Sequence, residues 1–318
     1  MNIEELKCIS YLTQSLSPLN KMSRYNIDQF SKITNIPKIN LRTWENRYSY
    51  LIPQRTQTNI RFYNDELLVR AIKTKLLIEN GCKISKVSKM TDDELEVTIE
   101  RIESTENQNS KIKYYLSNFI ISAINFDEYK FNTLFNKALK EFDFILFYKS
   151  IILPLLKRVG VLWLTNKMSP SQEHFISELI KQKLYVLIDQ NSGNIPTKDK
   201  WLLFLPENEF HEIGLLFAKY ILLLKEYHVI YLGGNLPIDT LTGVAKKHQI
   251  DNVLLFLHAN PSIKMFETHL QKCLNILPNS QIYVVTSNSK LEFEKLNTSK
   301  INLIHDLDGF IDLLDNSY

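Results

Sequence analysis

The 318-residue sequence predicts a multidomain chain of α and α/β parts, in which a helix-turn-helix head and a helical bundle precede a doubly wound parallel sheet. Three observations support this prediction. Two short helical patterns near residue 35 are separated by a turn that contains Asn and Pro. Four segments in the middle of the chain carry an apolar residue at every third or fourth position. After residue 200, continuous apolar runs alternate with amphipathic segments, as parallel strands alternate with crossover helices.

The composition excludes several classes of protein. Hydrophobic residues make up 44% and charged residues 23% of the chain, so it folds rather than remaining disordered. No apolar run approaches the roughly 18 residues that cross a bilayer, and the N-terminus lacks the pattern of a signal peptide. We therefore expect a cytoplasmic protein with no membrane partner. Cys8, Cys82 and Cys273 have no CxxC spacing, which argues against a disulfide framework and a structural zinc site.

The charge is distributed unevenly along the chain. Residues 21–90 contain 14 Lys and Arg against five Asp and Glu, a local net charge of +9. The whole chain carries +3, so the remaining residues carry −6. A basic segment joined to a mildly acidic body is typical of a DNA-binding head on a regulatory or catalytic body, although charge alone favours a solvated helix face.

The head is predicted at residues 22–95. An apolar residue at every third position predicts its first helix, and an Asn-Ile-Pro turn separates this helix from a second one. Ile39, Leu41 and Trp44 are expected to form the apolar side of the second helix. Two short strands and a further helix follow. The predicted elements, in order, cover residues 27–34, 38–48, 51–56, 60–63 and 65–79.

A helical bundle is predicted at residues 111–190, after a polar linker at residues 106–110. Its four amphipathic segments are long enough to pack together as a small bundle. They cover residues 111–125, 127–142, 144–163 and 169–188. A second linker is expected at residues 191–200, where Asn, Gly, Pro and Lys gather.

The C-terminal domain is predicted at residues 200–318. Five apolar runs, each followed by an amphipathic helix, predict a flavodoxin-like (Rossmann-like) sheet of five parallel strands. The expected strands cover residues 201–206, 228–233, 252–258, 281–287 and 301–304. Because ligands of such sheets bind at the carboxyl ends of the strands, any site should draw on the segments PENEFHEIG, GGNLP, HANPS and TSNS.

The segment LRTWENRYSYLIPQRTQTNIRFYNDEL, at residues 41–67, resembles the DNA-binding domain of the MerR family of transcriptional regulators. The family pattern runs Leu-Arg-x-Trp-Glu-x-Arg-Tyr, then Pro-x-Arg, then Arg-x-Tyr. Asn35 and Asn59 stand where the family has Gly, and Asn enters left-handed backbone more readily than most residues. The matching positions are Leu41, Arg42, Trp44, Glu45, Arg47, Tyr48, Pro53, Arg55, Arg61 and Tyr63.

This resemblance implies a winged helix-turn-helix whose second helix enters the major groove of double-stranded operator DNA. Four arginines at the family positions are expected to contact phosphates or the neighbouring minor groove, with Arg24 and Lys38 as weaker candidates. The alternative is that these are solvated surface charges. Trp44, Phe62 and Tyr63 are interpreted as the core of the head. The predicted DNA-binding residues are Lys38, Arg42, Arg47, Arg55 and Arg61.

Glu209, His211 and Gly214 follow the first strand of the C-terminal domain. Their spacing resembles the cobalamin-binding motif Asp/Glu-x-His-x-x-Gly. The resemblance implies that His211 is the lower axial ligand of cobalt and that Glu209 holds its other ring nitrogen. Gly214 would let a large flat group approach the backbone, and Gly233 lies in a loop, LGGNLP, that keeps the expected pattern. The alternative is an ordinary surface histidine near a strand end.

Trp163 is followed, after nine intervening residues, by Glu173 and His174. This spacing resembles the Trp-x9-Glu-His pattern in the helical cap of photoreceptor regulators of the CarH and LitR type, which have a MerR head, a four-helix cap and a cobalamin-binding domain in this order. The resemblance covers about residues 25–318. It implies that Trp163 covers the adenosyl group on the upper face of cobalt, beside the Glu-His pair. The alternative is a bundle-core tryptophan and a solvated helix face.

Two positions depart from the family. Phe256 stands where the third strand normally supplies a small Ser beside the benzimidazole tail, and Thr286 with Ser287 stand where the fourth strand ends in Gly-Gly. These side chains would occupy volume that the tail needs. A register shifted by one residue would place Leu255 or Leu257 there instead, and neither is small.

The predicted function is a MerR-type transcriptional repressor, not an enzyme, that senses cobalamin. By resemblance, the form is adenosylcobalamin and light acts by removing its adenosyl group. Dimers or tetramers would hold several heads on DNA together. One alternative keeps the regulator and gives the C-terminal domain only an oligomerisation or partner-binding role. Another is a corrinoid-dependent enzyme or methyl-carrier protein. The chain has no room for a catalytic barrel of about 250 residues, and a carrier would have no use for a DNA-binding head.

Overall fold

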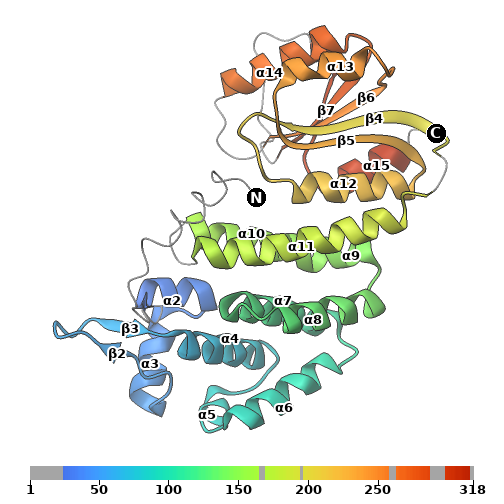
Figure 1. Ribbon diagram of the computed structural model, residues 1–318. Helices are drawn as coiled ribbons and strands as arrows, with labels where there is room; N and C mark the ends of the chain where they lie inside the picture. The colour runs from blue at the N-terminus through green and yellow to red at the C-terminus, as the bar shows by residue number, and fades with distance from the viewer. Residues whose placement is uncertain (1–23, 165–168, 194–195, 258–262, 287–297, 316–318) are drawn as a thin grey trace, which may run out of the picture. The chain divides into compact units, whose positions relative to one another are not determined.

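The computed structural model describes residues 24–164, 169–193, 196–257, 263–286 and 298–315 (Figure 1). The chain divides into two compact units, Met1–Phe175 and Ile176–Tyr318. The first unit contains the head and most of the bundle, and the second contains the sheet. Within the described ranges, no helix combines the length and the apolar character that a membrane span requires.

The head begins with the predicted helix-turn-helix. α2 (Ile27–Thr34) and α3 (Lys38–Tyr48) have the bounds that the sequence predicted. Asn35 in the turn has a φ of 56° and Asn59 in the wing a φ of 62°. Both asparagines therefore adopt the left-handed backbone that was expected where the family has Gly.

A small antiparallel sheet completes the DNA-binding fold. β2 (Gln54–Arg55) and β3 (Arg61–Tyr63) form the predicted wing, and Figure 1 shows it as a hairpin that projects from the head. An unpredicted strand, β1 (Tyr25–Asn26), pairs with β3, so the strand order is β1-β3-β2. The Tyr63 ring stacks on Phe30 with 4.0 Å between centroids, which ties the wing to the helix-turn-helix core.

Three helices close the head and lead into the bundle. α4 (Asp65–Glu79) has its predicted bounds, and α5 (Ile84–Val87) and α6 (Asp92–Glu103) follow. The expected linker at residues 106–110 is only partly correct, because a helix begins at Gln108. The Asn107 side chain accepts the N–H of Ser110 at 3.0 Å, so a polar residue that suits a linker serves here as a helix cap.

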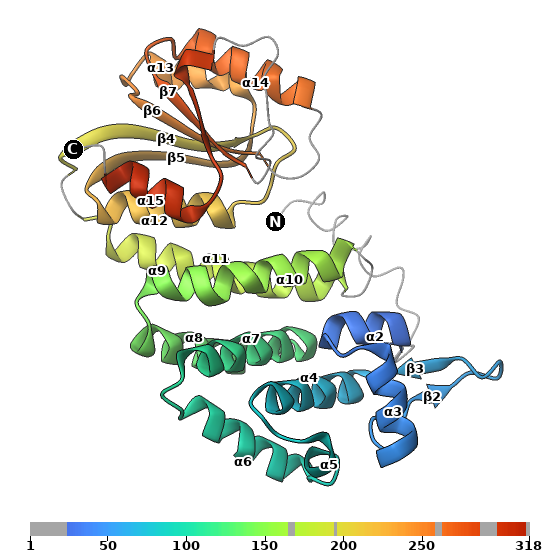
Figure 2. The same cartoon turned by 180° about the vertical axis from the view of Figure 1, so that it is seen from behind.

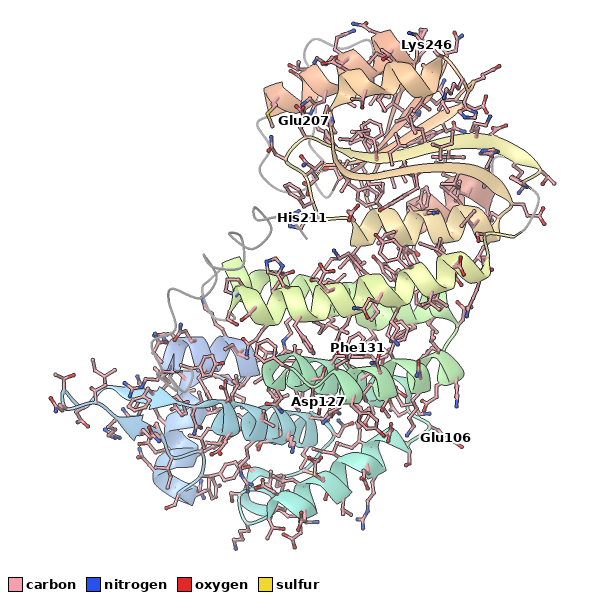
Figure 3. All side chains as sticks on the ribbon, viewed as in Figure 1. Glu106, Asp127, Phe131, Glu207, His211 and Lys246 are labelled. Atoms are coloured by element: carbon pink, nitrogen blue, oxygen red, sulfur yellow. The ribbon has the colours of Figure 1, made fainter. Side chains whose placement is uncertain are left out.

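The bundle is formed by long helices with an aromatic interior. The third expected helix is interrupted by a π-helical segment, so it is divided into three parts. Phe119, Phe131 and Phe147 are fully buried, and Figure 3 shows Phe131 inside the bundle. The elements are α7 (Gln108–Asn125), α8 (Glu128–Glu141), α9 (Phe144–Phe147), the π-helix (Tyr148–Ile152), α10 (Leu153–Leu164) and α11 (Pro170–Gln190).

The second unit is the predicted flavodoxin-like domain. Its five strands are all parallel and have the order β5-β4-β6-β7-β8. β4 begins at Lys198, earlier than expected, so the predicted linker at residues 191–200 is too long. The strands are β4 (Lys198–Pro206), β5 (Tyr227–Leu236), β6 (Asn252–Leu257), β7 (Gln281–Thr286) and β8 (Ile301–Ile304).

Helices cover both faces of this sheet. α12 and α15 lie on one face and α13 and α14 on the other, as the two opposite views show (Figures 1 and 2). The second expected helix is short, with a 3-10 turn (Ile238–Leu241) before α13, and the helix expected at 290–296 lies outside the described residues. The described helices are α12 (Ile213–Leu224), α13 (Thr242–Ala245), α14 (Ile263–Ile276) and α15 (Leu307–Asp315), with a second 3-10 turn at Thr298–Lys300.

Candidate functional site

The second helix of the head, α3, presents a polar face to solvent. Lys38, Arg42 and Arg47 are exposed, whereas Leu41 and Trp44 are buried in the core of the head. The predicted core role of Trp44 is therefore confirmed. Lys38 also forms an exposed ion pair of 2.5 Å with Asp28, and such pairs contribute little to stability. Exposure is the condition that a side chain must meet to contact a phosphate, and these three cations meet it.

The two wing arginines have a different arrangement. Arg55 and Arg61 both bind Glu45 on α3, at 2.7 and 2.8 Å. Burial alone would raise the pKa of Glu45, but the hydrogen bonds and charges of Arg61 and Arg55 outweigh it and hold that pKa below its usual value. Arg55 also donates to the side chain of Asn59 at 2.8 Å. The Glu45 carboxylate thus joins the wing to α3, a link that the sequence analysis did not identify.

The two other aromatic residues that were predicted to lie in the core differ in their burial. Tyr63 is buried, as predicted, and Phe62 is only partly buried. The Arg24 guanidinium lies over the Phe62 ring, 4.8 Å from its centroid, in a cation–π contact. Arg24 therefore packs on the wing strand β3.

These arrangements predict different effects of salt on DNA affinity. Arg42→Ala or Arg47→Ala is expected to weaken binding to all sequences and to flatten the log-log salt slope by about 0.9 for each phosphate that is no longer neutralised. Arg61→Ala should also weaken binding, with a smaller change in slope, because Arg61 acts through Glu45. The measurement is a salt titration of operator binding by fluorescence anisotropy. Arg101→Ala, on the exposed side of α6, is the charge-matched control; equal slopes for all four variants would contradict this prediction.

Ile39 does not occupy the predicted place. It was expected on the apolar side of α3, yet it is 67% exposed. Ile39 and Leu41 are about 200° apart around a helix, so both cannot face the core. An exposed isoleucine between Lys38 and Arg42 is suited to contact a thymine methyl group in the major groove. The period of the helix could therefore have shown, from the sequence alone, that Ile39 and Leu41 do not share one face.

The role of Ile39 can be tested with modified DNA. If Ile39 contacts a thymine methyl, replacing that thymine by deoxyuridine should lower the affinity of the natural protein by about 1 kcal/mol or more, and the same replacement should have little effect on Ile39→Ala. A scan of single thymines in the operator would be measured against both proteins. Val97→Ala, another exposed apolar position, is the control. Equal sensitivity of the natural and Ile39→Ala proteins to every replacement would exclude the contact.

The loop after β4 holds the predicted histidine and acid together. One oxygen of Glu209 lies 2.5 Å from Nδ1 of His211 and accepts the backbone N–H groups of Phe210 and His211, each at 2.9 Å. The His211 side chain is 71% exposed, and Figure 3 shows it on this loop. Glu209 holds Nδ1, so Nε2 is the ring nitrogen that points away from this carboxylate. In this arrangement, His211 would be the residue that holds the cobalt of a corrinoid, with Glu209 fixing the orientation of its ring.

The loop after β4 is joined to the carboxyl end of β5, which extends to Leu236 and so includes Gly233 and Gly234, both expected in a loop. Asn235 donates its N–H to the carbonyl of Glu209 at 2.9 Å, and Gly234 donates to the Glu212 carboxylate at 2.7 Å. A Cβ on Gly234 would lie 3.0 Å from the Glu209 carbonyl oxygen, and Gly233 has a φ of 79°. Both glycines are therefore required by geometry. Glu212 was not singled out in the sequence, because it is an unspecified position of the motif.

Gly214 opens a space that a neighbouring ring fills. A Cβ on Gly214 would lie 2.7 Å from Cε1 of Phe256. Phe256 therefore faces α12, whereas Leu255 is buried in the cluster that includes Phe266 and Leu270 of α14, on the other face of the sheet. The register that places Phe256 beside the motif is favoured over Leu255. The Leu257 side chain lies outside the described residues.

The residues present would therefore suit one part of cobalamin and not another. The His211–Glu209 pair fits the lower face of a corrinoid. The space beside Gly214 does not fit an inserted tail in this arrangement, because the Phe256 ring occupies it. Thr286, at the end of β7, is buried, and its carbonyl accepts a hydrogen bond of 3.2 Å from Nδ1 of His305. Ser287 lies outside the described residues.

Glu173 and His174 lie together in the first turn of α11. His174 Nδ1 is 3.2 Å from a Glu173 oxygen, and the His174 side chain is 74% exposed. Gln172 donates from its amide nitrogen to the carbonyl of Ile124 at 3.2 Å, which holds this end of α11 against α7. The backbone of Trp163 lies in α10, and its side chain lies outside the described residues.

Two family models match the chain. Residues 25–94 match the MerR HTH family regulatory protein model, and residues 116–188 match a B12 binding domain model. More than half of the chain has a solved counterpart in fold. A monomethylamine corrinoid protein of Methanosarcina barkeri has a TM-score of 0.50 and 14% identity, and the match covers 62% of this chain and 95% of that one.

The curated relatives include regulators. The HTH-type transcriptional repressor CarH of Myxococcus xanthus is 23% identical over 257 residues, which is 80% of this chain and 85% of the relative. The repressor CarA of the same organism is 28% identical over 232 residues, 72% and 75% of the two chains. The regulator MlrA of Escherichia coli is 36% identical over 73 residues, 23% of this chain and 30% of MlrA, so it matches over a much shorter stretch.

Together, the two family models and the two repressor relatives support a cobalamin-controlled transcriptional regulator. The combination of a MerR HTH segment with a B12 binding domain segment supports a MerR-family regulator with a cobalamin-binding domain. The relatives that match most of its length are named as repressors rather than enzymes.

Proposed function

We propose that this protein is a transcriptional repressor whose hold on operator DNA is set by a corrinoid bound through His211. The observation that carries the proposal is the Glu209–His211 pair, 2.5 Å apart on an exposed loop at the carboxyl edge of the sheet. A carboxylate on one ring nitrogen fixes the tautomer and the orientation of the imidazole and makes the other nitrogen a better ligand. In a chain with a DNA-binding head, such a site would serve as a sensor that controls DNA binding.

DNA binding would use two groups of residues with different tasks. Lys38, Arg42 and Arg47 on α3 would contact DNA directly, and Ile39 would add base readout. Arg55 and Arg61 would hold the wing in position through Glu45, with Arg55 nearer to solvent. Because one small head binds DNA weakly, we propose that the repressor acts as a dimer or tetramer, in which tethered heads bind as a unit.

Control would depend on two states with different contacts. Adenosylcobalamin, when bound, would supply a light-sensitive upper ligand. Trp163, Glu173 and His174 would form the protein surface that distinguishes this form from one without the adenosyl group. A difference in affinity between the two states of the bundle is what allows the ligand to change the oligomer and hence DNA affinity.

A second candidate function is a regulator whose sheet domain binds no cofactor and serves assembly or partner binding. The Phe256 ring beside Gly214 favours it, because the ring occupies space that an inserted tail would need. A methyl-carrier role has support in the fold alone and leaves the head without a task.

The two functions are separated by an absorption spectrum. Protein purified with adenosylcobalamin in darkness should carry the corrinoid, and illumination should change both the spectrum and the affinity for operator DNA. Bound corrinoid with no change in DNA affinity, in darkness or in light, would contradict corrinoid control. No bound corrinoid, with DNA binding retained, would establish the second candidate.

A further inference from the structure

Arg158, on α10 of the bundle, contacts the helix-turn-helix directly. Its Nη2 donates a hydrogen bond of 2.6 Å to the carbonyl oxygen of Ile33, in the last turn of α2. The two residues are 125 positions apart in the sequence and belong to the same compact unit. Neither DNA contact nor corrinoid binding, as proposed above, explains this bond.

The Ile33 carbonyl cannot be satisfied within its own helix. Its helical donor would be the N–H of residue 37, and Pro37 has none. The N–H groups of Asn35 and Ile36 are both directed to the carbonyl of Ser31. The last carbonyls of a helix carry partial negative charge, so a guanidinium is a favourable partner. Arg158 therefore supplies the C-terminal cap of α2 from the bundle.

The surroundings of this bond are largely apolar. Ile33 and Ile36 are each 1% exposed, and Val159, next to Arg158 on α10, is buried as well. Burial lowers the pKa of Arg158, and the charge of Glu79 acts in the opposite direction. If this bond were broken, the partly buried guanidinium and the buried carbonyl would each lose a hydrogen-bond partner, which costs free energy. The bond therefore favours one defined placement of α10 against α2.

We propose that Arg158 is a positioning residue that transmits the state of the bundle to the DNA-reading helix. α3 follows α2 after a three-residue turn, so the end of α2 sets where α3 begins. α10 ends at Leu164, shortly before the first turn of α11 that holds Glu173 and His174. A shift of α10 breaks or restores the bond to Ile33 and so changes the placement of α3. This inference rests on the proposed corrinoid control.

The test compares two arginines with similar bonds. Arg158→Met removes the guanidinium and keeps an unbranched apolar side chain. The control is Arg70→Met, because Arg70 also donates to a backbone carbonyl, that of Met90 at 2.6 Å, but lies wholly within the head. Both full-length variants would be checked for folding by circular dichroism and thermal unfolding. DNA affinity would be measured with and without adenosylcobalamin, and amide exchange in α2 and in the turn that follows it, at Asn35 and Ile36, without it.

In the natural protein, the corrinoid is expected to change DNA affinity by about 5- to 150-fold. Arg158→Met should reduce this ratio to about 2-fold or less while corrinoid still binds, and should speed exchange of the Asn35 and Ile36 amides about 10-fold. Arg70→Met should leave the ratio unchanged. A folded Arg158→Met protein that keeps the full ratio would overturn the proposal.

Failure of the proposed function has a different signature. If the corrinoid leaves DNA affinity of the natural protein unchanged, corrinoid control is wrong, and the positioning role then depends on the cofactor-free data. Faster exchange in α2 and weaker DNA binding in Arg158→Met, but not in Arg70→Met, would still support positioning. Exchange and DNA affinity equal to those of the natural protein would overturn that role as well.

Discussion

Replacing His211 by alanine is expected to lower corrinoid affinity by about 100-fold or more, because the imidazole is the one protein ligand proposed for cobalt. The fold should remain intact, since the side chain is 71% exposed on a loop. Glu209→Gln should have an intermediate effect of about 10-fold, because an amide can hold the ring but supplies no charge. The measurement is a spectroscopic titration of each variant with adenosylcobalamin in darkness.

The control for this prediction is His248→Ala, which removes another exposed histidine of the same unit. It should bind corrinoid as the natural protein does. Unchanged affinity in His211→Ala would show that the match to the cobalamin motif at Glu209, His211 and Gly214 is fortuitous. In that case the cofactor-free regulator would be the better account of the sheet domain.

The second large effect is expected at Phe256. Phe256→Ser, combined with Thr286→Gly and Ser287→Gly, should tighten binding of full-length cobalamin by roughly 10- to 100-fold, because overfilling a packed site costs about 1–3 kcal/mol. Cobinamide, which lacks the nucleotide tail, should bind the natural protein and the triple variant about equally. Isothermal titration of both corrinoids against both proteins gives the four affinities.

The position of the ring has an independent measure in stability. Gly214→Ala should destabilise the natural protein by about 1–3 kcal/mol, because the added methyl would lie 2.7 Å from Phe256 Cε1. The same substitution in a Phe256→Ser background should cost less. Equal costs in both backgrounds would mean that the ring does not face Gly214. Tight cobalamin binding by the natural protein, with no gain in the triple variant, would show that the ring does not block the tail.

The sequence predicted best those parts of the fold that local chemistry determines. The helix-turn-helix was placed to the residue because its turn and apolar spacing all lie within 22 positions, Ile27–Tyr48. Asn35 and Asn59 were assigned left-handed backbone because few other residues tolerate it. The parallel sheet was predicted from its continuous apolar strands, because a strand that is covered on both faces needs apolar side chains on both.

The boundaries and the pairings were harder to predict. Asn107 is polar enough for a linker, yet it caps α7, and composition does not distinguish these roles. The pairing of Glu45 with Arg55 and Arg61 depends on how the wing folds back onto α3, which no spacing reveals. The bond between Arg158 and Ile33 joins residues 125 positions apart and is likewise set by tertiary packing.

At the candidate corrinoid site, the resemblance suggested both the Glu209–His211 pair and an obstructed tail space, but not how close the obstructing ring lies to the motif. The contact between Glu209 and His211 was expected from the resemblance of this segment to the cobalamin-binding motif. Phe256 was placed near the motif by counting along a strand, and the alternation of side chains across the sheet supports that count over Leu255. How closely its ring approaches Gly214 depends on the separation of α12 from the sheet, which only the structure gives.

The π-helical segment Tyr148–Ile152 determines in which direction around the helix axis the side chains of α10 point. The N–H of Leu153 is bonded to the carbonyl of Tyr148, five residues back, so this turn accommodates one residue more than an α-helical turn. Removing that extra residue, for example by deleting Ser150, would turn α10 by about 100° about its axis relative to α9. Arg158 would then point away from Ile33. An inserted residue of this kind is thus a built-in angular offset: its loss would turn both Arg158 and Trp163 of α10, while the proposed DNA-contacting residues of α3 would stay unchanged in sequence.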